Sequence, residues 1–142
     1  MNKSAAGQQY AKINAQTGIV DADPHRLIQM LYAGALEQIS VARGCIQRED
    51  IAGKGEAIGK AIGIVGGLRD SLDAEPSSES AALSLELAAL YEFVTTKLSD
   101  ANVRSDIAAL DESATVLREL QDGWNGIRAD AVAHFKQSST MA

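Results

Sequence analysis

The stretch DPHRLIQMLYAGALEQISVARGCIQ, residues 23–47, carries the clearest helical pattern in the chain. Its apolar side chains recur at spacings of three and four, which is the period of one face of an α-helix. The residues of this face are Ile28, Leu31, Ala35, Ile39, Ala42 and Ile46. Asp23 is a favourable N-cap, and Pro24 suits the first helical position, where its missing N–H costs nothing. The stretch therefore predicts a helix from about Pro24 to Gln47.

The same helix carries more apolar residues than one packing face needs. Leu27, Tyr32 and Leu36 widen the stripe to well over half of the circumference, whereas a surface helix needs a stripe only about 100° wide. Two interpretations remain open. Either the helix is central in a bundle, or it also lines a groove that receives an amphipathic guest.

Three further stretches have the helical period. The second helix starts near Asp50, the third follows a cap at Ser77–Ser78, and the fourth begins at Ser105 or Asp106. The second presents Ile58, Ala61, Val65, Leu68 and Leu72. The third presents Leu83, Leu87, Leu90, Val94, Leu98 and Ala101. The fourth presents Ile107, Leu110, Ala114, Leu117, Leu120 and Trp124.

Short connections between long helices make sequential helices antiparallel neighbours. The expected fold is therefore all-α, an antiparallel up-down four-helix bundle over residues 23–135. Residues 1–22 are expected to form a short helical or extended cap segment, and residues 136–142 a disordered tail. At 142 residues the chain fits one domain.

Composition narrows the functional classes. The net charge of −6 argues against a nucleic-acid partner, which needs a basic surface to displace counterions from phosphate. No apolar run approaches the roughly 20 residues needed to span a bilayer, so membrane insertion is not expected. Residues 1–10 lack the apolar core of a secretory signal, and Cys45 is the only cysteine, so we expect a cytoplasmic protein without disulfides.

The sequence offers no pattern that predicts catalysis. His25 and His134 lack the Glu-x-x-His spacing of a di-metal bundle, because Ala22 and Ala131 stand three residues before them. A phosphotransfer bundle needs an exposed histidine in mid-helix, whereas His25 stands at a helix start, where it is expected to be a surface residue. We therefore expect no enzyme activity, no metal and no cofactor.

Glycines cluster in the second predicted helix. Gly55, Gly59, Gly63 and Gly67 are each four residues apart and lie beside the apolar stripe. Each interior glycine costs roughly 1 kcal/mol of helix stability relative to alanine, so this helix depends on tertiary contacts. Two interpretations remain open: the row packs against a neighbouring helix, or it forms a shallow groove for a guest helix.

The opening helix resembles that of the flagellar secretion chaperone FliS family. Residues 22–36, ADPHRLIQMLYAGAL, match the family pattern Ser-Pro-His-x-Leu-Ile-x-Met-Leu-Tyr/Phe-Asp-Gly-Ala. Further blocks follow in the same order at KGEAI 54–58, KAIGIV 60–65, LYEF 90–93 and LSDAN 98–102, and then Trp124. The chain departs from the pattern at Asp23 for serine, at Ala33 for aspartate, and at the additional glycines Gly59 and Gly63.

The resemblance implies a cytoplasmic chaperone that binds the C-terminal segment of unassembled flagellin in a 1:1 complex. It implies that the chaperone prevents premature polymerisation and assists delivery to the flagellar type III export apparatus, with an export-gate component as a second partner. The near-N-terminal tyrosine of the family matches Tyr10, in a segment that packs over part of the hydrophobic surface and moves aside for flagellin. The residues expected to cap or line the flagellin groove are Tyr10, Ile13, Leu27, Ile28, Leu31, Tyr32, Gly59 and Gly63. A purely structural bundle, or a chaperone for a different exported subunit, is the remaining alternative.

Overall fold

The computed structural model describes the backbone of residues 23–74 and 78–141. Its side chains are described for residues 23–72 and 81–127. The expected cap segment and the loop around Pro76 lie outside the described residues. The elements are α2 (Pro24–Gln47), α3 (Ile51–Asp70), the 3₁₀ turn η1 (Ser71–Ala74), α4 (Ser78–Arg104) and α5 (Ile107–Met141).

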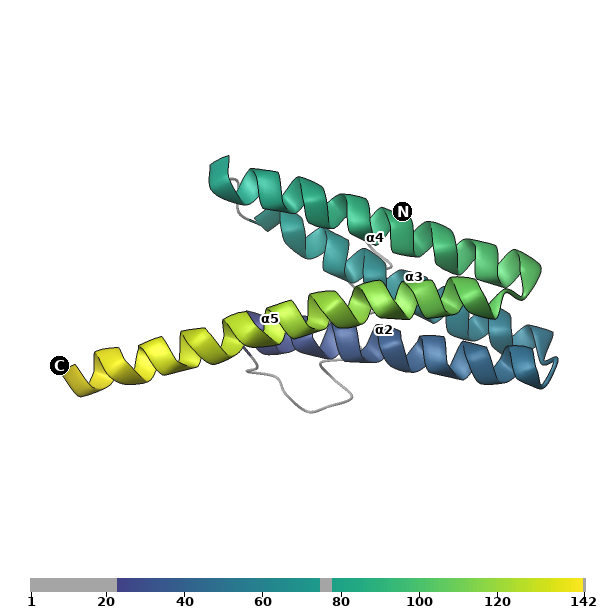
Figure 1. Ribbon diagram of the computed structural model, residues 1–142, viewed down its shortest axis with the longest axis horizontal. Coiled ribbons are helices and arrows are strands. Elements are labelled where there is room, and N and C mark those ends of the chain that lie inside the picture. The colour runs from purple at the N-terminus through teal and green to yellow at the C-terminus, as the bar shows by residue number, and fades with distance from the viewer. Residues whose placement is uncertain (1–22, 75–77, 142) are drawn as a thin grey trace.

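The four helices run alternately up and down and pack side by side, α2 with α3, α3 with α4, α4 with α5, and α5 with α2 (Figure 1). The expected all-α four-helix bundle is confirmed. The two turns α2–α3 and α4–α5 lie together at one end, called here the closed end. Toward the other end, where α2 and α4 begin, the α3–α4 pair spreads away from the α2–α5 pair (Figure 1). We call that end the open end.

The predicted cap at Asp23 is formed, and Asp50, near which the second helix is expected to start, is an N-cap as well. The Asp23 carboxylate accepts a hydrogen bond of 2.9 Å from the Arg26 N–H, and Pro24 occupies the first turn of α2. The Asp50 carboxylate accepts one of 2.9 Å from the Gly53 N–H at the start of α3. These bonds satisfy donors that a helix start leaves without intrahelical partners, which explains why the sequence places the two boundaries correctly.

The two turns at the closed end are left-handed caps made without glycine. Glu49 has a φ of 57° and Ser105 a φ of 50°. After each, the next N–H reaches back to a helix carbonyl, from Asp50 to Cys45 at 2.8 Å and from Asp106 to Ala101 at 3.2 Å. This pattern, the Schellman type, reverses the chain within three residues and keeps each helix pair close.

The core is aliphatic and lies between the four helices. Its best-buried large side chains are Leu31, Ile58, Val65, Leu68, Val94, Leu98, Leu110 and Leu117. Alanines with essentially no exposure at Ala35, Ala42, Ala61 and Ala101 let the helices approach closely. The predicted faces of α2, α3 and α5 therefore correspond to the core, as their periodicity indicates.

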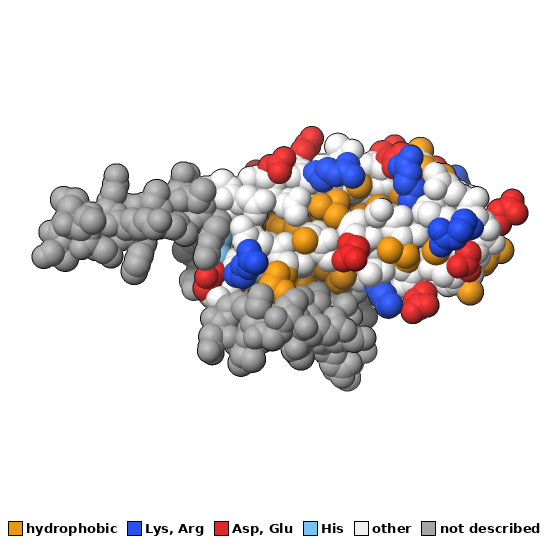
Figure 2. Space-filling view, turned by 90° about the horizontal axis from the view of Figure 1, so that it is seen from below, with side chains coloured by type: hydrophobic (Ala, Val, Ile, Leu, Met, Phe, Trp, Pro, Cys, Tyr) orange, Lys and Arg blue, Asp and Glu red, His pale blue; other side chains and the backbone are white. Residues whose placement is uncertain are grey.

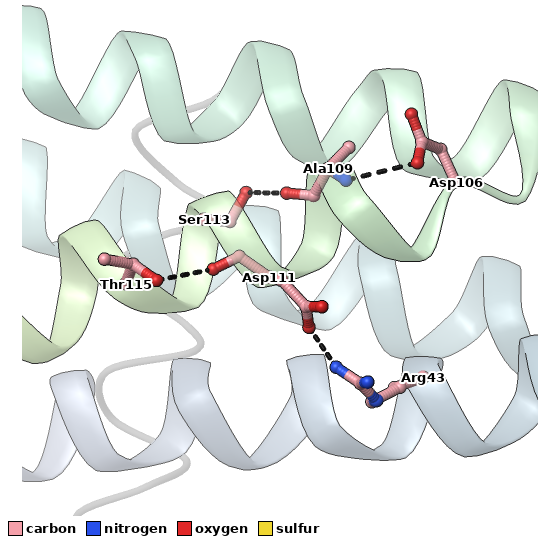
Figure 3. A network of polar contacts seen from close by, with 6 residues as sticks. All are labelled: Arg43, Asp106, Ala109, Asp111, Ser113 and Thr115. Carbon is pink, nitrogen blue, oxygen red and sulfur yellow. Dashed lines mark hydrogen bonds and ion pairs between the residues drawn. The ribbon is translucent and has the colours of Figure 1, made fainter.

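Polar contacts fix the start of α5 (Figure 3). The Asp106 carboxylate accepts a 3.3 Å hydrogen bond from the Ala109 N–H, and Arg43 of α2 forms an ion pair with Asp111. Both partners of that ion pair are about half exposed, 46% and 51%, so water screens it and it contributes little to stability. Its effect is to mark where α5 packs against α2.

The helix α5 is longer than the sequence predicts. It extends through Met141, whereas the predicted bundle ends at residue 135 and a disordered tail follows. No glycine or proline occurs after Gly126, and the next residues include several alanines, so nothing in the local sequence stops a helix. Side chains of residues 128–142 lie outside the described part.

Candidate partner-binding surface

Three of the residues expected to line a flagellin groove lie in the core. Leu31 is 1% exposed, Tyr32 3% and Ile28 9%, while Leu27 is partly buried. The surplus of apolar residues on α2 thus reflects its contacts with both α3 and α5. Burial within the bundle accounts for much of this wide stripe, and the groove interpretation stays a prediction.

A pair of tyrosines joins α2 to α4 through the middle of the bundle. The hydroxyls of Tyr32 and Tyr91 lie 2.6 Å apart, and each ring is 3% exposed. Burial raises the pKa of Tyr32, and the nearby Tyr91 raises it further; burial also raises the pKa of Tyr91, which the hydrogen bond to Tyr32 partly opposes. Both phenols are therefore neutral at physiological pH and act as a polar contact between two helices.

Removing one of the two hydroxyls is expected to lower the free energy of unfolding by more than removing both. Tyr32→Phe leaves the Tyr91 hydroxyl buried without this partner, which costs about 1–3 kcal/mol of unfolding free energy, and Tyr91→Phe does the same to Tyr32. The double variant leaves no orphaned hydroxyl, so its stability is expected to exceed the additive value by about 1 kcal/mol or more. Urea denaturation of the four proteins measures this coupling, and strict additivity would contradict it.

The same pair gives a pH signature. In the unfolded chain a phenol loses its proton near pH 10.0, whereas the folded protein resists this because both pKa values are raised. The contribution of the two tyrosines to the free energy of unfolding is therefore complete below pH 10. It falls as the pH rises above 10, since only the unfolded chain can then release the two protons. The double phenylalanine variant should show a shallower decline in the same denaturation series.

The other expected site residues fall into two groups. Tyr10 and Ile13 lie outside the described residues. Gly59 and Gly63 are on the outer side of α3, where an added Cβ meets no described atom within 4 Å. The described helices therefore do not pack closely on these two glycines, and the interpretation of the row as a neighbour-packing surface fails there.

The largest departure from the predicted core is on α4. The C-terminal half of α4 contributes Val94, Leu98 and Ala101 to the core. In contrast, Leu83 is 56% exposed, Leu90 38% and Phe93 42%. With the partly buried Leu87 between them, these side chains form a continuous surface. We call Leu83, Leu87, Leu90 and Phe93 the α4 apolar face.

The α4 apolar face is exposed because α5 follows α2 rather than α4 toward the open end. Near the closed end, Lys97 of α4 and Glu112 of α5 form an ion pair of 3.0 Å. Farther along, the Trp124 indole donates a 3.0 Å hydrogen bond to the His25 carbonyl, and Gln29 donates one of 2.8 Å to Asn125. These contacts hold α5 on α2 while α4 diverges (Figure 1).

Sequence reasoning missed this surface for a physical reason. Period three-and-four spacing groups Leu83, Leu87 and Leu90 with Val94 and Leu98, and it cannot tell which of them a neighbouring helix covers. A signal was nevertheless present, because Phe93, which is 42% exposed, adds an apolar side chain outside the predicted stripe of the same helix. An excess of this kind on one helix favours an interaction surface.

The described residues hold no arrangement typical of catalysis. His25 is stacked on Trp124 with ring centroids 4.2 Å apart and is partly buried. The sequence predicts a surface residue at this position, and a phosphotransfer histidine needs to be exposed. Among residues 23–72 and 81–127 no three His, Cys, Asp or Glu side chains group as metal ligands. None of the described helices is long and apolar enough to cross a membrane.

One face of the described molecule has side chains of mixed type. On the face in Figure 2, hydrophobic side chains emerge in small groups between Lys or Arg and Asp or Glu. Such a surface lacks the single-sign field that steers a highly charged polymer. The α4 apolar face differs from this mixed surface because its exposed side chains Leu83, Leu90 and Phe93 are neighbours on one helix.

Comparison with known proteins gives the family. The family model described as flagellar protein FliS matches residues 6–131. The flagellar secretion chaperone FliSB of Pseudomonas aeruginosa is 46% identical over 122 residues, which cover 86% of this chain and 94% of that protein. The flagellar secretion chaperone FliS of Salmonella typhimurium is 35% identical over 123 residues, 86% of this chain and 89% of that protein. The protein of that name from Escherichia coli is 36% identical over 118 residues, 82% and 85% of the two chains. The chain therefore belongs to the FliS family of flagellar proteins.

Proposed function

We propose that this chain is a cytoplasmic export chaperone for flagellin. It binds the C-terminal segment of unassembled flagellin, prevents premature polymerisation and assists delivery to the flagellar type III export apparatus. The observation that supports this most strongly is the α4 apolar face, a row of leucines and a phenylalanine left uncovered in a bundle whose relatives are named flagellar secretion chaperones.

The proposal matches an exposed apolar helix face with a disordered guest segment that has no apolar surface to fold against. A disordered segment with an amphipathic pattern folds when its apolar side meets such a surface, in the way helices dock into grooves. Ordering the guest costs several kcal/mol of the gross interaction energy. The complex is therefore specific but releasable without nucleotide hydrolysis, as a chaperone that hands its guest to an export machine requires.

The N-terminal segment has a place in the same proposal. Tyr10 and Ile13 cap part of the hydrophobic surface in the free protein and move aside when flagellin binds. The open space next to Gly59 and Gly63, where an added Cβ meets no described atom within 4 Å, offers a second place where the guest can approach α3 closely. The α2 residues act indirectly, because they hold α2 in the position that leaves the α4 apolar face open. These residues are Leu27, Ile28, Leu31 and Tyr32. An export-gate component is the second partner.

The test is titration calorimetry with a synthetic peptide of the C-terminal segment of the flagellin from the same bacterium. We expect a 1:1 complex, a negative heat-capacity change from apolar burial, and a gain in helicity by circular dichroism. A peptide from the N-terminal segment of that flagellin is the matched control and should bind more weakly. Absence of binding at high micromolar concentration would overturn the proposal, and preference for another exported flagellar subunit would favour the alternative chaperone.

A further inference from the structure

The closed end of the bundle holds a pocket of about 470 Å³ that the proposed function does not use. It lies where the α2–α3 and α4–α5 turns come together (Figure 1), and its volume falls in the range of sites for small molecules. Two of its lining side chains are buried, Cys45 at 3% exposure and Lys54 at 7%, and Ile46 is partly buried. The other lining residues are exposed, so the pocket has a buried floor and an exposed rim.

The floor of the pocket carries an ammonium group with spare hydrogen-bond donors. Lys54 donates a 2.8 Å hydrogen bond to the Ser105 Oγ, and no carboxylate among the described residues forms an ion pair with it. A lysine is seldom so deeply buried unless it is paired. An ammonium has three donors, and the Ser105 hydroxyl, which accepts from Lys54, keeps its own proton to donate. Lys54 and Ser105, called here the donor pair, therefore suit the two oxygens of one carboxylate.

The rim of the pocket carries the opposite charge. Glu49 and Asp50 line it and are exposed, and neither is in an ion pair within the part of the chain whose side chains are described. Asp50 uses one oxygen to cap α3 and keeps the other. We call these two residues the acidic rim. Between floor and rim, Ile46 and Ile51 supply aliphatic surface. The pocket is thus positive at its floor, negative at its mouth and apolar between them.

The backbone at this pocket has an unusual feature. Glu49 and Ser105 are the non-glycine residues with positive φ among those described, and both line the pocket. Glycine is the usual residue at such a turn, because a Cβ is disfavoured in the left-handed conformation. The chain instead carries a carboxylate and a hydroxyl at these two positions. Both side chains are of the kind that binds a charged small molecule.

We propose that the closed-end pocket binds a small zwitterion, a linear amino acid with its two charges at opposite ends. Its carboxylate accepts hydrogen bonds from the donor pair, its ammonium lies at the acidic rim, and its methylene chain packs on Ile46 and Ile51. A simple carboxylate would be repelled by the acidic rim and a simple amine by Lys54, so the pocket selects a ligand that carries both charges. This site does not include the α4 apolar face, and the inference does not depend on the proposed function.

Heteronuclear NMR titration of the nitrogen-labelled protein tests the proposal with three probes of the same chain length. The probes are δ-aminovalerate, which has both charges, valerate, which has only the carboxylate, and n-pentylamine, which has only the ammonium. We expect δ-aminovalerate to shift the amide signals of residues 49–54 and 105–106 saturably. The other two should bind at least about tenfold more weakly, because each lacks the charged contacts at one end. Equal affinity for all three would indicate an adventitious ion only, and absence of localised shifts at millimolar concentration would also overturn the proposal.

Variants that keep the fold assign the two ends of the ligand. Ser105→Gly removes one donor and suits the left-handed backbone, so the protein should stay folded while δ-aminovalerate binding falls about tenfold. Glu49→Gln should narrow the difference between δ-aminovalerate and valerate. Glu37→Gln makes the same charge change at an exposed position of α2 outside the pocket and should leave every affinity unchanged. Unchanged δ-aminovalerate affinity in folded Ser105→Gly or Glu49→Gln protein would contradict the assigned contacts and overturn the site.

Discussion

Replacing Leu83 and Leu90 together by glutamate is expected to weaken flagellin-peptide binding by about ten- to a hundredfold without unfolding the chaperone. Full burial of an exposed leucine contributes about 1.5–3 kcal/mol, and the guest can bury only the exposed 56% of Leu83 and 38% of Leu90, so loss of both contacts removes about 1.5–3 kcal/mol of binding free energy. The fold should persist because the two side chains are already 56% and 38% exposed, so the carboxylates remain in water. Titration calorimetry gives the affinity, and thermal unfolding monitors the fold.

Leu85→Glu is the matched control. Leu85 lies on the same helix and is 74% exposed, but helical geometry places it well away from Leu83 and Leu90, facing out of the bundle. The same change there alters net charge and helix propensity equally per substitution and leaves the α4 apolar face intact. Binding within a few-fold of the unmodified protein is expected. A folded Leu83→Glu/Leu90→Glu protein that binds as tightly as this control would exclude the α4 apolar face as the docking surface.

The architecture was predictable because its determinants are local. The caps at Asp23 and Asp50 and the three-and-four spacing of aliphatic residues specify where helices begin and which side they bury, and these signals act within a few residues. The short turns at Glu49 and Ser105 then leave antiparallel packing as the available arrangement. The bundle thus follows from the sequence without knowledge of any long-range contact.

The α4 apolar face was less predictable because it depends on which residues of α4 the neighbouring helix α5 leaves exposed. Whether Leu90 is core or surface depends on where α5 goes, and that path is set by contacts almost a hundred residues apart, such as Trp124 with His25. The Tyr32–Tyr91 contact is likewise long-range and leaves no periodic signal. The resemblance implied a partner surface with residues of α2 and α3, among them the buried Leu31 and Tyr32, and it indicated no residue of α4.

This distinction has an experimental consequence at Leu31. The side chain is 1% exposed and belongs to the best-buried part of the core, so Leu31→Ala is expected to cost about 2–5 kcal/mol of unfolding free energy. For a chain of this size, such a loss lowers the Tm by roughly 6–20 °C. Leu31→Asp adds the cost of burying an unpaired carboxylate and should leave the protein largely unfolded, because total stability is about 5–15 kcal/mol.

Ala33→Asp is the control that separates the loss of core packing at Leu31 from the effect of placing an aspartate anywhere in this part of α2. Ala33 is exposed two residues farther along α2, and the family pattern itself has aspartate there, so stability should change by about 0.5 kcal/mol or less. Circular dichroism melting of both aspartate variants decides the matter. If Leu31→Asp melted near the unmodified protein yet failed to bind the flagellin peptide, Leu31 would have to contact the guest directly. If it is unfolded, its binding defect carries no information about docking, and the docking surface has to be tested at exposed residues, such as those of α4, by loss of affinity in a folded protein.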